Sequence, residues 1–262
     1  MRPLSQLGEA EARGLFGVAF DLDDTVLTKG ELTEDAYRAL FAMKRSGLRL
    51  LAVTGRPSAW GELVARQWPV DGCIAENGAI YTYRDQGHLS RLDQEPEAER
   101  RSRRIRLSQI VVAAREAVPE ARLTDDMDGR ISDVTWDIGE RTRLPEDRIQ
   151  ALIAVIVAHG ARWSRSSVHA HATFDTVDKA SGIVRFCHLR FGEDASRTLA
   201  RLAFVGDSGN DAPCFAAFRT TVGVANVKNH LAHLTVPPRY VTSRAMGEGF
   251  AELAAHLTGL RG

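Results

Sequence analysis

The chain of 262 residues has few cysteines, no excess of charge of either sign and no long apolar run. Cys73, Cys187 and Cys214 are odd in number and far apart, which fits neither a disulfide framework nor the spacing of a zinc site. The 34 basic and 34 acidic residues cancel to a formal net charge of +0, so the molecule as a whole offers no general attraction to nucleic acid or to an anionic membrane. Any bound anion must therefore be recognised locally.

The sequence also lacks signals for membrane insertion. No stretch approaches the ~20 apolar residues of a membrane-spanning helix, and residues 1–14 are polar and charged rather than carrying the apolar core of a secretion signal. We therefore expect a cytoplasmic protein with no membrane and no nucleic-acid partner. The sequence leaves the oligomeric state open.

What the sequence does contain is an alternation of apolar runs with segments of helical period, which is typical of a parallel sheet with crossover helices. The expected core strands include residues 15–20, 48–53, 202–205 and 221–224, and Glu76-Asn77-Gly78 is expected to turn a hairpin. From about residue 85 to residue 174 the order becomes helix, two strands, helix, two strands, which predicts a compact α+β insert. The predicted fold is thus an α/β core of residues 1–84 and 175–262, interrupted by an inserted domain of residues 85–174.

The most informative segment is Asp21-Leu22-Asp23-Asp24-Thr25, which directly follows the first expected strand. Crowded carboxylates at a strand end repel one another and lose hydration, so the arrangement favours a site for a divalent cation or a transferring phosphoryl group. The alternative is an acidic turn that caps the next element, because Asp and Thr are ordinary turn and cap residues.

Three further segments are expected at the same edge of the sheet, because parallel strands bring their carboxyl ends together. Thr54 and Gly55 follow the second strand and offer a hydroxyl and backbone donors at a helix start, where a phosphate binds well. The loop 206–211, Gly-Asp-Ser-Gly-Asn-Asp, adds two carboxylates, and Lys179 adds one positive charge. Arg56 fits a phosphate contact and a surface salt bridge equally well.

Taken in order, these four motifs resemble those of the haloacid dehalogenase superfamily of phosphotransferases. The insert lies between the second and third motifs, and its duplicated layout resembles the α+β cap of the subgroup that contains sugar phosphatases and phosphomannomutases. The resemblance implies a Rossmann-like parallel-sheet core with an inserted cap. Two positions depart from the pattern, since Asp24 and Ala180 stand where glycine is more frequent.

The resemblance also implies roles for individual residues. Asp21 would be the nucleophile that forms an aspartyl-phosphate, and Asp23 would be the general acid and base. The implied cofactor is Mg²⁺, held by the Asp21 carboxylate, the Asp23 carbonyl and Asp207, with Asp211 in the outer shell. The implied phosphate-binding residues are Thr54, Gly55, Lys179 and Asn210, the last through orientation of Lys179 or Asp21.

Substrate choice is expected to lie in the cap, because the core motifs recognise only the phosphoryl group. Ser167, His169, His171 and Thr173 share one face of an expected strand, and this face would contact a hydroxylated leaving group. A solvated outer face is the alternative. Arg130 is a further candidate contact. The arginine run from Arg100 to Arg106 is interpreted as a solvated helix face.

The sequence therefore predicts a Mg²⁺-dependent phosphatase of a small phosphorylated metabolite, with a sugar phosphate favoured. One alternative is a phosphosugar mutase, which would use the same aspartyl-phosphate and return the phosphoryl group to its substrate. A phospho-accepting signalling domain also places acidic residues, Thr and Lys at strand ends, but it is much smaller and needs neither Asp23 nor a cap.

Overall fold

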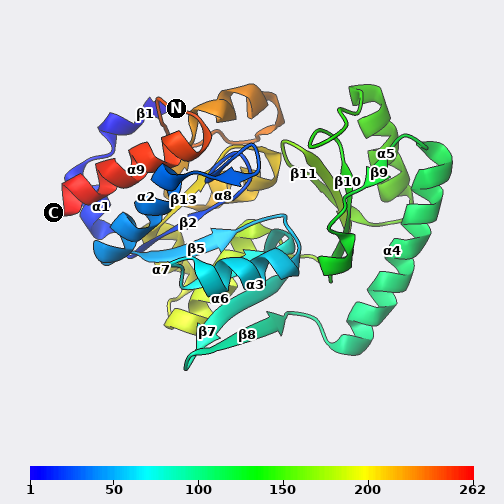
Figure 1. Ribbon diagram of the computed structural model, residues 1–262, viewed down its shortest axis with the longest axis horizontal. Coiled ribbons are helices and arrows are strands. Elements are labelled where there is room, and N and C mark those ends of the chain that lie inside the picture. Colours follow the sequence, from blue (N-terminus) through cyan, green and yellow to red (C-terminus); the bar gives the residue numbers. More distant parts are fainter.

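The computed structural model of the chain describes every residue except for the side chain of His233, and it contains a larger α/β domain and a smaller α+β domain (Figure 1). The larger domain, called the core, is built on a nine-stranded sheet of order β1-β15-β14-β13-β2-β5-β6-β7-β8. Neighbouring strands are parallel from β1 to β6, whereas β7 and β8 are antiparallel to their neighbours. The strands are β1 (Arg2–Pro3), β2 (Gly17–Phe20), β5 (Arg49–Val53), β6 (Gly72–Ala75), β7 (Ile80–Asp85), β8 (His88–Asp93), β13 (Leu202–Gly206), β14 (Thr220–Gly223) and β15 (Tyr240–Val241).

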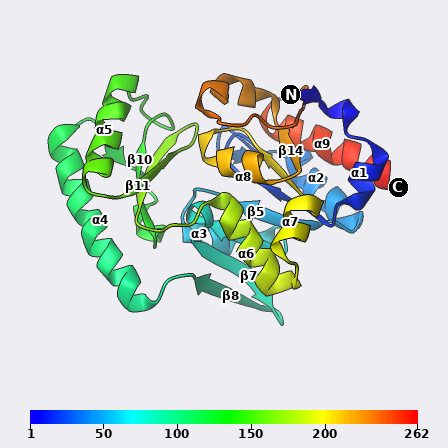
Figure 2. The same ribbon diagram turned by 180° about the vertical axis from the view of Figure 1, so that it is seen from behind.

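Helices cover both faces of this sheet (Figures 1 and 2). Alternate residues of β2 supply the two faces, since Val18 and Phe20 join one apolar cluster and Ala19 joins the other. The first cluster is covered by α1 (Glu9–Gly14), α2 (Glu34–Arg45), α3 (Ser58–Gln67) and α9 (Met246–Arg261). The second is covered by α6 (Lys179–Phe191), α7 (Ala195–Arg201) and α8 (Ala212–Ala217). The core is completed by 3-10 helices η1 (Leu4–Gln6), η2 (Glu76–Gly78), η4 (Gly209–Asp211) and η5 (Ala225–His233) and by the hairpin of β3 (Leu27–Thr28) and β4 (Glu31–Leu32).

The smaller domain, called the cap, comprises residues 97–173. Its antiparallel sheet has the order β11-β12-β10-β9, formed by β9 (Arg122–Leu123), β10 (Asp133–Asp137), β11 (Arg162–Arg165) and β12 (His169–Thr173). Helices α4 (Glu97–Ala117) and α5 (Glu146–Ala158) cover the outer face of this sheet, and η3 (Met127–Gly129) lies in the turn between β9 and β10. Figures 1 and 2 show the sheet between these helices and the core. The predicted order of two helices and two strand pairs is confirmed.

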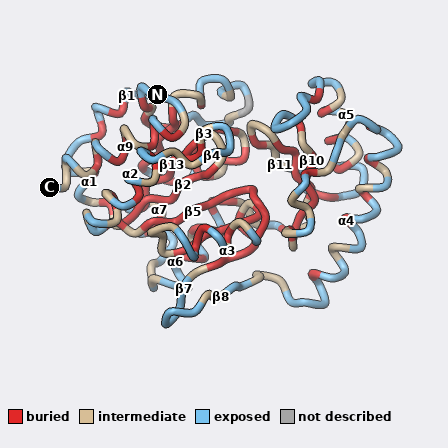
Figure 3. Tube along the Cα trace, in the orientation of Figure 1, coloured by how far each residue is buried: buried red, intermediate tan, exposed pale blue. Residues whose placement is uncertain are grey.

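The period of β12 explains which face meets the core. Ala170 and Ala172 pack among the side chains of α4 and α5, so His169, His171 and Thr173 point the other way. His169 and His171 are only 2% and 1% exposed, because the opposite face of the cap sheet lies against the core. The alternative of a solvated outer face is therefore wrong for these two residues. Figure 3 shows buried residues on the strands of both sheets and exposed residues along the outer side of α4.

The boundary at which the chain enters the cap differs from the predicted one. Residues 88–93 form β8, which pairs with β7 at the edge of the core sheet, so the chain enters the cap after Asp93 rather than at residue 85. Gln86 and Gly87, both with positive φ, form a tight turn that adds β8 to the edge of the core sheet after β7. The composition of this charged stretch does not predict the turn.

The arginine run of α4 is not a solvated face throughout. Arg100 is 6% exposed and binds Asp93 and Asp175, which lie on the two connections between core and cap. Arg103 also binds Asp175, and the Arg106 guanidinium lies 3.6 Å from the ring centroid of Phe174. Only the three-dimensional approach of the two connections to α4 makes these contacts possible. No helix of the described residues is both long and apolar enough to cross a membrane.

Candidate active site

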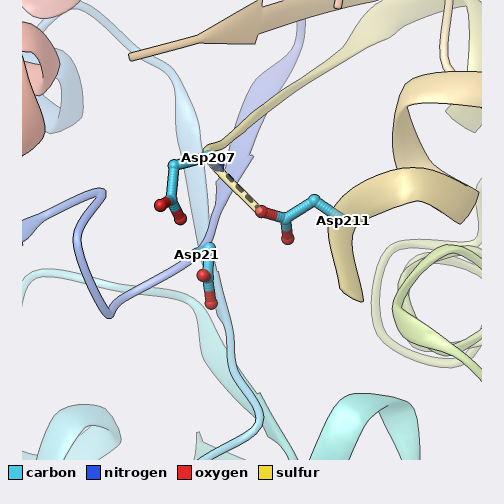
Figure 4. A group of neighbouring side chains, drawn as sticks. All are labelled: Asp21, Asp207 and Asp211. Carbon is cyan, nitrogen blue, oxygen red and sulfur yellow. Dashed lines mark hydrogen bonds between the residues drawn. The ribbon is translucent and has the colours of Figure 1, made fainter. Parts of the chain in front are cut away.

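Three buried carboxylates meet where two neighbouring parallel strands end (Figure 4). Asp21 directly follows β2 and Asp207 directly follows β13, and these strands pair in register, so their carboxyl ends lie side by side. Asp211 comes from η4, and its Oδ2 accepts hydrogen bonds from the backbone amides of Asp207 at 2.9 Å and Ser208 at 3.1 Å. One ligand oxygen from each carboxylate lies within 4.8 Å of the others, and all three residues are buried.

Lys179 binds two of these carboxylates. Its Nζ lies 2.7 Å from Asp21 Oδ1 and 2.7 Å from Asp211 Oδ1, and its side chain is fully buried at the first turn of α6. Burial lowers the pKa of Lys179, but the two carboxylates raise it more, so the ammonium is charged. This helix starts where the sequence predicts, because Asp178 caps it by accepting a hydrogen bond from the Ser181 amide.

One ammonium does not balance three carboxylates. Burial, opposed by Lys179 and helped by Asp211 and Asp23, raises the pKa of Asp21 to about 7. Burial and the neighbouring carboxylates likewise raise the pKa of Asp207 well above its usual range. The site thus has a deficit of positive charge and only oxygen ligands from its carboxylates, which is the donor set of Mg²⁺ or a similar hard divalent cation.

Asp207 is held by two side chains that contact no other member of the trio. Thr25 Oγ1 donates to Asp207 Oδ1 at 3.2 Å, and Asn226 Nδ2 donates to Asp207 Oδ2 at 2.9 Å. Asn226 also donates to the Asp24 carbonyl and accepts from the Met246 amide. Asn226 was not predicted from the sequence, although it follows β14 and therefore lies at the same edge of the sheet as Asp207.

Asp23 does not point into this trio but binds Arg56. The Arg56 Nε lies 2.9 and 3.0 Å from the two Asp23 oxygens, and Nη2 donates to Oδ1 at 2.5 Å. The Arg56 guanidinium is 6% exposed and lies 4.1 Å from the ring centroid of Trp60. Arg56 therefore forms a salt bridge, but a buried one with the expected general acid rather than one on the surface.

The other predicted phosphate-binding residues lie nearby. Thr54 is fully buried, and its Oγ1 accepts a hydrogen bond from the Arg56 amide at 3.0 Å. Asn210 donates to Asn77 Oδ1 at 3.1 Å and accepts from Ser208 Oγ at 3.0 Å. Its amide is thus engaged with η2 and its own loop rather than with Lys179 or Asp21.

The core and cap are joined next to this site. Glu76, which is 4% exposed, accepts hydrogen bonds from the amides of Ile131 and Ser132 in the cap and from Ser58 in the core. Arg130 of the cap donates to the Gly55 carbonyl at 2.8 Å and to Asp133 at 3.1 Å. Arg130, predicted as a substrate contact, is therefore an interdomain contact. Glu76, predicted only as part of a turn, joins the two domains as well.

A cavity of about 460 Å³ lies between the two domains. The core supplies Lys179, Asn77 and Asn210 to its walls, and the cap supplies His171, Ser167 and Thr173 from the predicted face, together with residues of β11 such as Trp163. His169 is not among the residues that line this cavity. Its Nε2 instead contacts Glu140 Oε2 at 2.9 Å. Three of the four residues on the predicted face thus share a cavity with Lys179.

Comparison with known proteins gives one family. Residues 18–100, which hold the first two motifs, match the family described as haloacid dehalogenase-like hydrolase. No curated protein matches the sequence significantly.

Solved structures extend the similarity to the whole chain. A protein from Thermoplasma acidophilum has a TM-score of 0.71 at 15% identity, over 93% of this chain and 98% of that one. The sucrose-phosphatase of Synechocystis, solved with sucrose and phosphate, has a TM-score of 0.64 at 16% identity, over 94% and 98%. The C-terminal domain of trehalose-6-phosphate phosphatase from C. albicans has a TM-score of 0.68 at 14% identity, over 99% and 98%.

The match over residues 18–100 agrees with the predicted resemblance to the haloacid dehalogenase superfamily. Residues 18–100 thus resemble a family of hydrolases, and the structures similar over the whole chain include proteins named as phosphatases. The Rossmann-like core with an inserted α+β cap is confirmed by the same structures.

Proposed function

We propose that the protein is a Mg²⁺-dependent phosphomonoester hydrolase that acts on a small phosphorylated metabolite, a sugar phosphate in the first instance, through an aspartyl-phosphate. The observation that supports this most strongly is the buried group of Asp21, Asp207 and Asp211 around Lys179, beside a cavity that Lys179 lines. Such a group combines a carboxylate nucleophile with fixed positive charge for phosphoryl oxygens.

Each residue has a defined task in this reaction. Asp21 attacks phosphorus, while Lys179 and Thr54 bind the phosphoryl oxygens. Asp23 in its protonated form would give its proton to the leaving oxygen, and the resulting carboxylate, which Arg56 holds beside the site, would then take a proton from the attacking water. Mg²⁺, held by the carboxylates of Asp21 and Asp207 and by the Asp23 backbone carbonyl, with Asp211 in the outer shell, would supply the charge that reduces repulsion between the nucleophile and an anionic substrate.

Three considerations favour a sugar phosphate and a cytoplasmic enzyme. The cavity is of the size that holds small ligands, and polar cap residues line it. Two structurally similar proteins are named sucrose-phosphatase and trehalose-6-phosphate phosphatase. The three cysteines, Cys73, Cys187 and Cys214, are free and buried, which suits a reducing compartment. The net charge of +0 suits a small substrate better than nucleic acid or a membrane.

The test is phosphate release from a panel of phosphorylated sugars with and without Mg²⁺. We expect turnover that needs the metal and that falls about 10³-fold or more in Asp21→Asn, because the amide is not a nucleophile. Asp85→Asn removes an exposed carboxylate at the far edge of the core sheet and serves as the matched control.

The outcomes separate the alternatives. Transfer between positions of a sugar bisphosphate without release of phosphate would indicate a phosphosugar mutase. Turnover that survives Asp21→Asn would refute the proposed nucleophile.

A further inference from the structure

Two buried polar atoms at the cavity lack a hydrogen-bond partner among the described residues, and both belong to the cap. They are Nε2 of His171 and Oγ of Ser167. Both residues line the cavity that Lys179 also lines. Because buried polar atoms are nearly always satisfied in folded proteins, unsatisfied atoms at a cavity indicate groups that a bound ligand completes.

His171 lies directly over the expected phosphate-binding loop. A Cβ built on Gly55 would lie 3.1 Å from Nε2 of His171 and 3.2 Å from Nδ2 of Asn77. Gly55 follows Thr54, so the imidazole lies close to where the phosphoryl group and the adjoining part of the leaving group are expected. The absence of a side chain at Gly55 allows this close approach of the cap.

The hydrogen bonds of His171 define which ring nitrogen carries the proton. Nδ1 lies 3.0 Å from Asp133 Oδ2 and 2.9 Å from Thr135 Oγ1. Burial would raise the pKa of Asp133, but Arg130 and its hydrogen bonds lower it to about 2, so this carboxylate is ionised and only accepts. Nδ1 must therefore be the donor. Burial lowers the pKa of His171 more than Asp133 raises it, which leaves the ring neutral and Nε2 an acceptor.

The arginines of the cavity are already engaged with the protein. Arg162 donates to the carbonyls of Asp175 and Val177, and Arg165 donates to both carboxylate oxygens of Glu146. The unsatisfied groups, an acceptor at His171 and a hydroxyl at Ser167, suit a neutral hydroxylated molecule.

We propose that His171 determines specificity by accepting, at Nε2, a hydrogen bond from a hydroxyl group of the leaving group close to the phosphate ester, with Ser167 binding a second hydroxyl. The enzyme thereby selects monophosphates whose leaving group carries hydroxyl groups over those whose leaving group lacks them. Because this role rests on the proposed function, its test needs a substrate that reports hydrolysis without any hydroxyl on the leaving group.

The experiment compares p-nitrophenyl phosphate, whose leaving group has no spare hydroxyl, with the best sugar phosphate of the panel. His171→Phe keeps a ring of similar size and loses the acceptor. We expect kcat/KM for the sugar phosphate to fall about 10- to 100-fold and kcat/KM for p-nitrophenyl phosphate to change less than about 3-fold. His171→Gln, which can place an oxygen near the position of Nε2, should restore part of the loss. His169→Phe, a change of the neighbouring histidine that contacts Glu140, should leave the ratio of the two values unchanged.

A second measurement needs no variant. Native enzyme should hydrolyse glycerol 3-phosphate about 10-fold or more faster, in kcat/KM, than the propane-1,3-diol monophosphate that lacks its middle hydroxyl. An equal loss on both substrates in His171→Phe, or equal rates for glycerol 3-phosphate and its deoxy analogue, would overturn the role of His171. No hydrolysis of any phosphate ester by the native enzyme, p-nitrophenyl phosphate included, would instead overturn the proposed function.

Discussion

Replacing Arg100 should destabilise the protein far more than replacing its neighbour Arg101. The Arg100 guanidinium joins the two connections between core and cap, since Nη1 lies 2.9 Å from both Asp175 oxygens, and Nε and Nη2 lie 2.8 and 2.7 Å from the Asp93 oxygens. The side chains of Arg100 and Asp175 are 8% and 3% exposed. Arg100→Met keeps much of the apolar stem and removes the charge and the donors.

The expected loss can be worked from these contacts. Removing one partner of a buried ion pair costs about 3–5 kcal/mol, because the remaining charge is left without compensation. Asp175 keeps a second partner in Arg103, and Asp93 is 26% exposed and can be partly rehydrated. The loss for Arg100→Met should therefore be lower, about 2–3 kcal/mol. Arg101 and Glu97 form an exposed pair with side chains 73% and 88% accessible, so Arg101→Met should cost about 0–0.5 kcal/mol.

Urea unfolding followed by tryptophan fluorescence measures the difference. Trp136 and Trp163 report on the cap, and Trp60 and Trp68 report on the core. The free energy of unfolding should fall selectively in Arg100→Met, with the largest change in the transition that involves the cap. If the two variants unfold within about 0.5 kcal/mol of each other, Arg100 does not stabilise the connections and the reasoning is wrong.

Three further outcomes are expected. Folding raises the pKa of Asp21 from 3.8 to about 7 and raises the pKa of Asp207 as well, so their contribution to the stability of the metal-free protein is lost as the pH rises through this range. Millimolar Mg²⁺ should therefore raise Tm more at about pH 8 than at about pH 5. An equal rise at both pH values would contradict a carboxylate metal site. Asn226→Ala, which frees Asp207 Oδ2, should weaken Mg²⁺ binding measured by calorimetry about 10- to 100-fold, and unchanged affinity would dismiss its orienting role. Arg56→Met should lower kcat about 10- to 100-fold with little change in KM, because Asp23 loses the partner that orients it, whereas an effect on KM alone would point to a phosphate contact.

The core motifs could be predicted from the sequence because strand ends of a parallel sheet converge regardless of the details of packing. Asp21 and Asp207 each follow an apolar run, so their meeting at one edge follows once the sheet is recognised. Helix α6 could be delimited as well, since Asp178 caps its start and Gly192, with φ of 68°, ends it. The polar face of β12 follows from the two-residue period alone.

The contacts between core and cap could not be predicted in this way. Three contacts join segments that are more than thirty residues apart. They are the hydrogen bond that the Glu76 carboxylate accepts from the Ile131 amide, the bond from Arg130 to the Gly55 carbonyl, and the ion pair of Arg56 with Asp23. Their residue types are equally common on solvated surfaces, so no local pattern distinguishes them.

The sequence by itself determined the two-domain α/β architecture, the group of carboxylates with Lys179 and which residues share the polar face of β12, because these depend on periodicity and on the ends of strands. Only the tertiary structure decided which cap residues line the cavity, that His171 rather than His169 offers a free acceptor there, and that Arg100 and Arg130 join the domains. Those outcomes depend on which charges and hydrogen-bond donors become buried together, and burial of that kind exists only when the whole chain has folded.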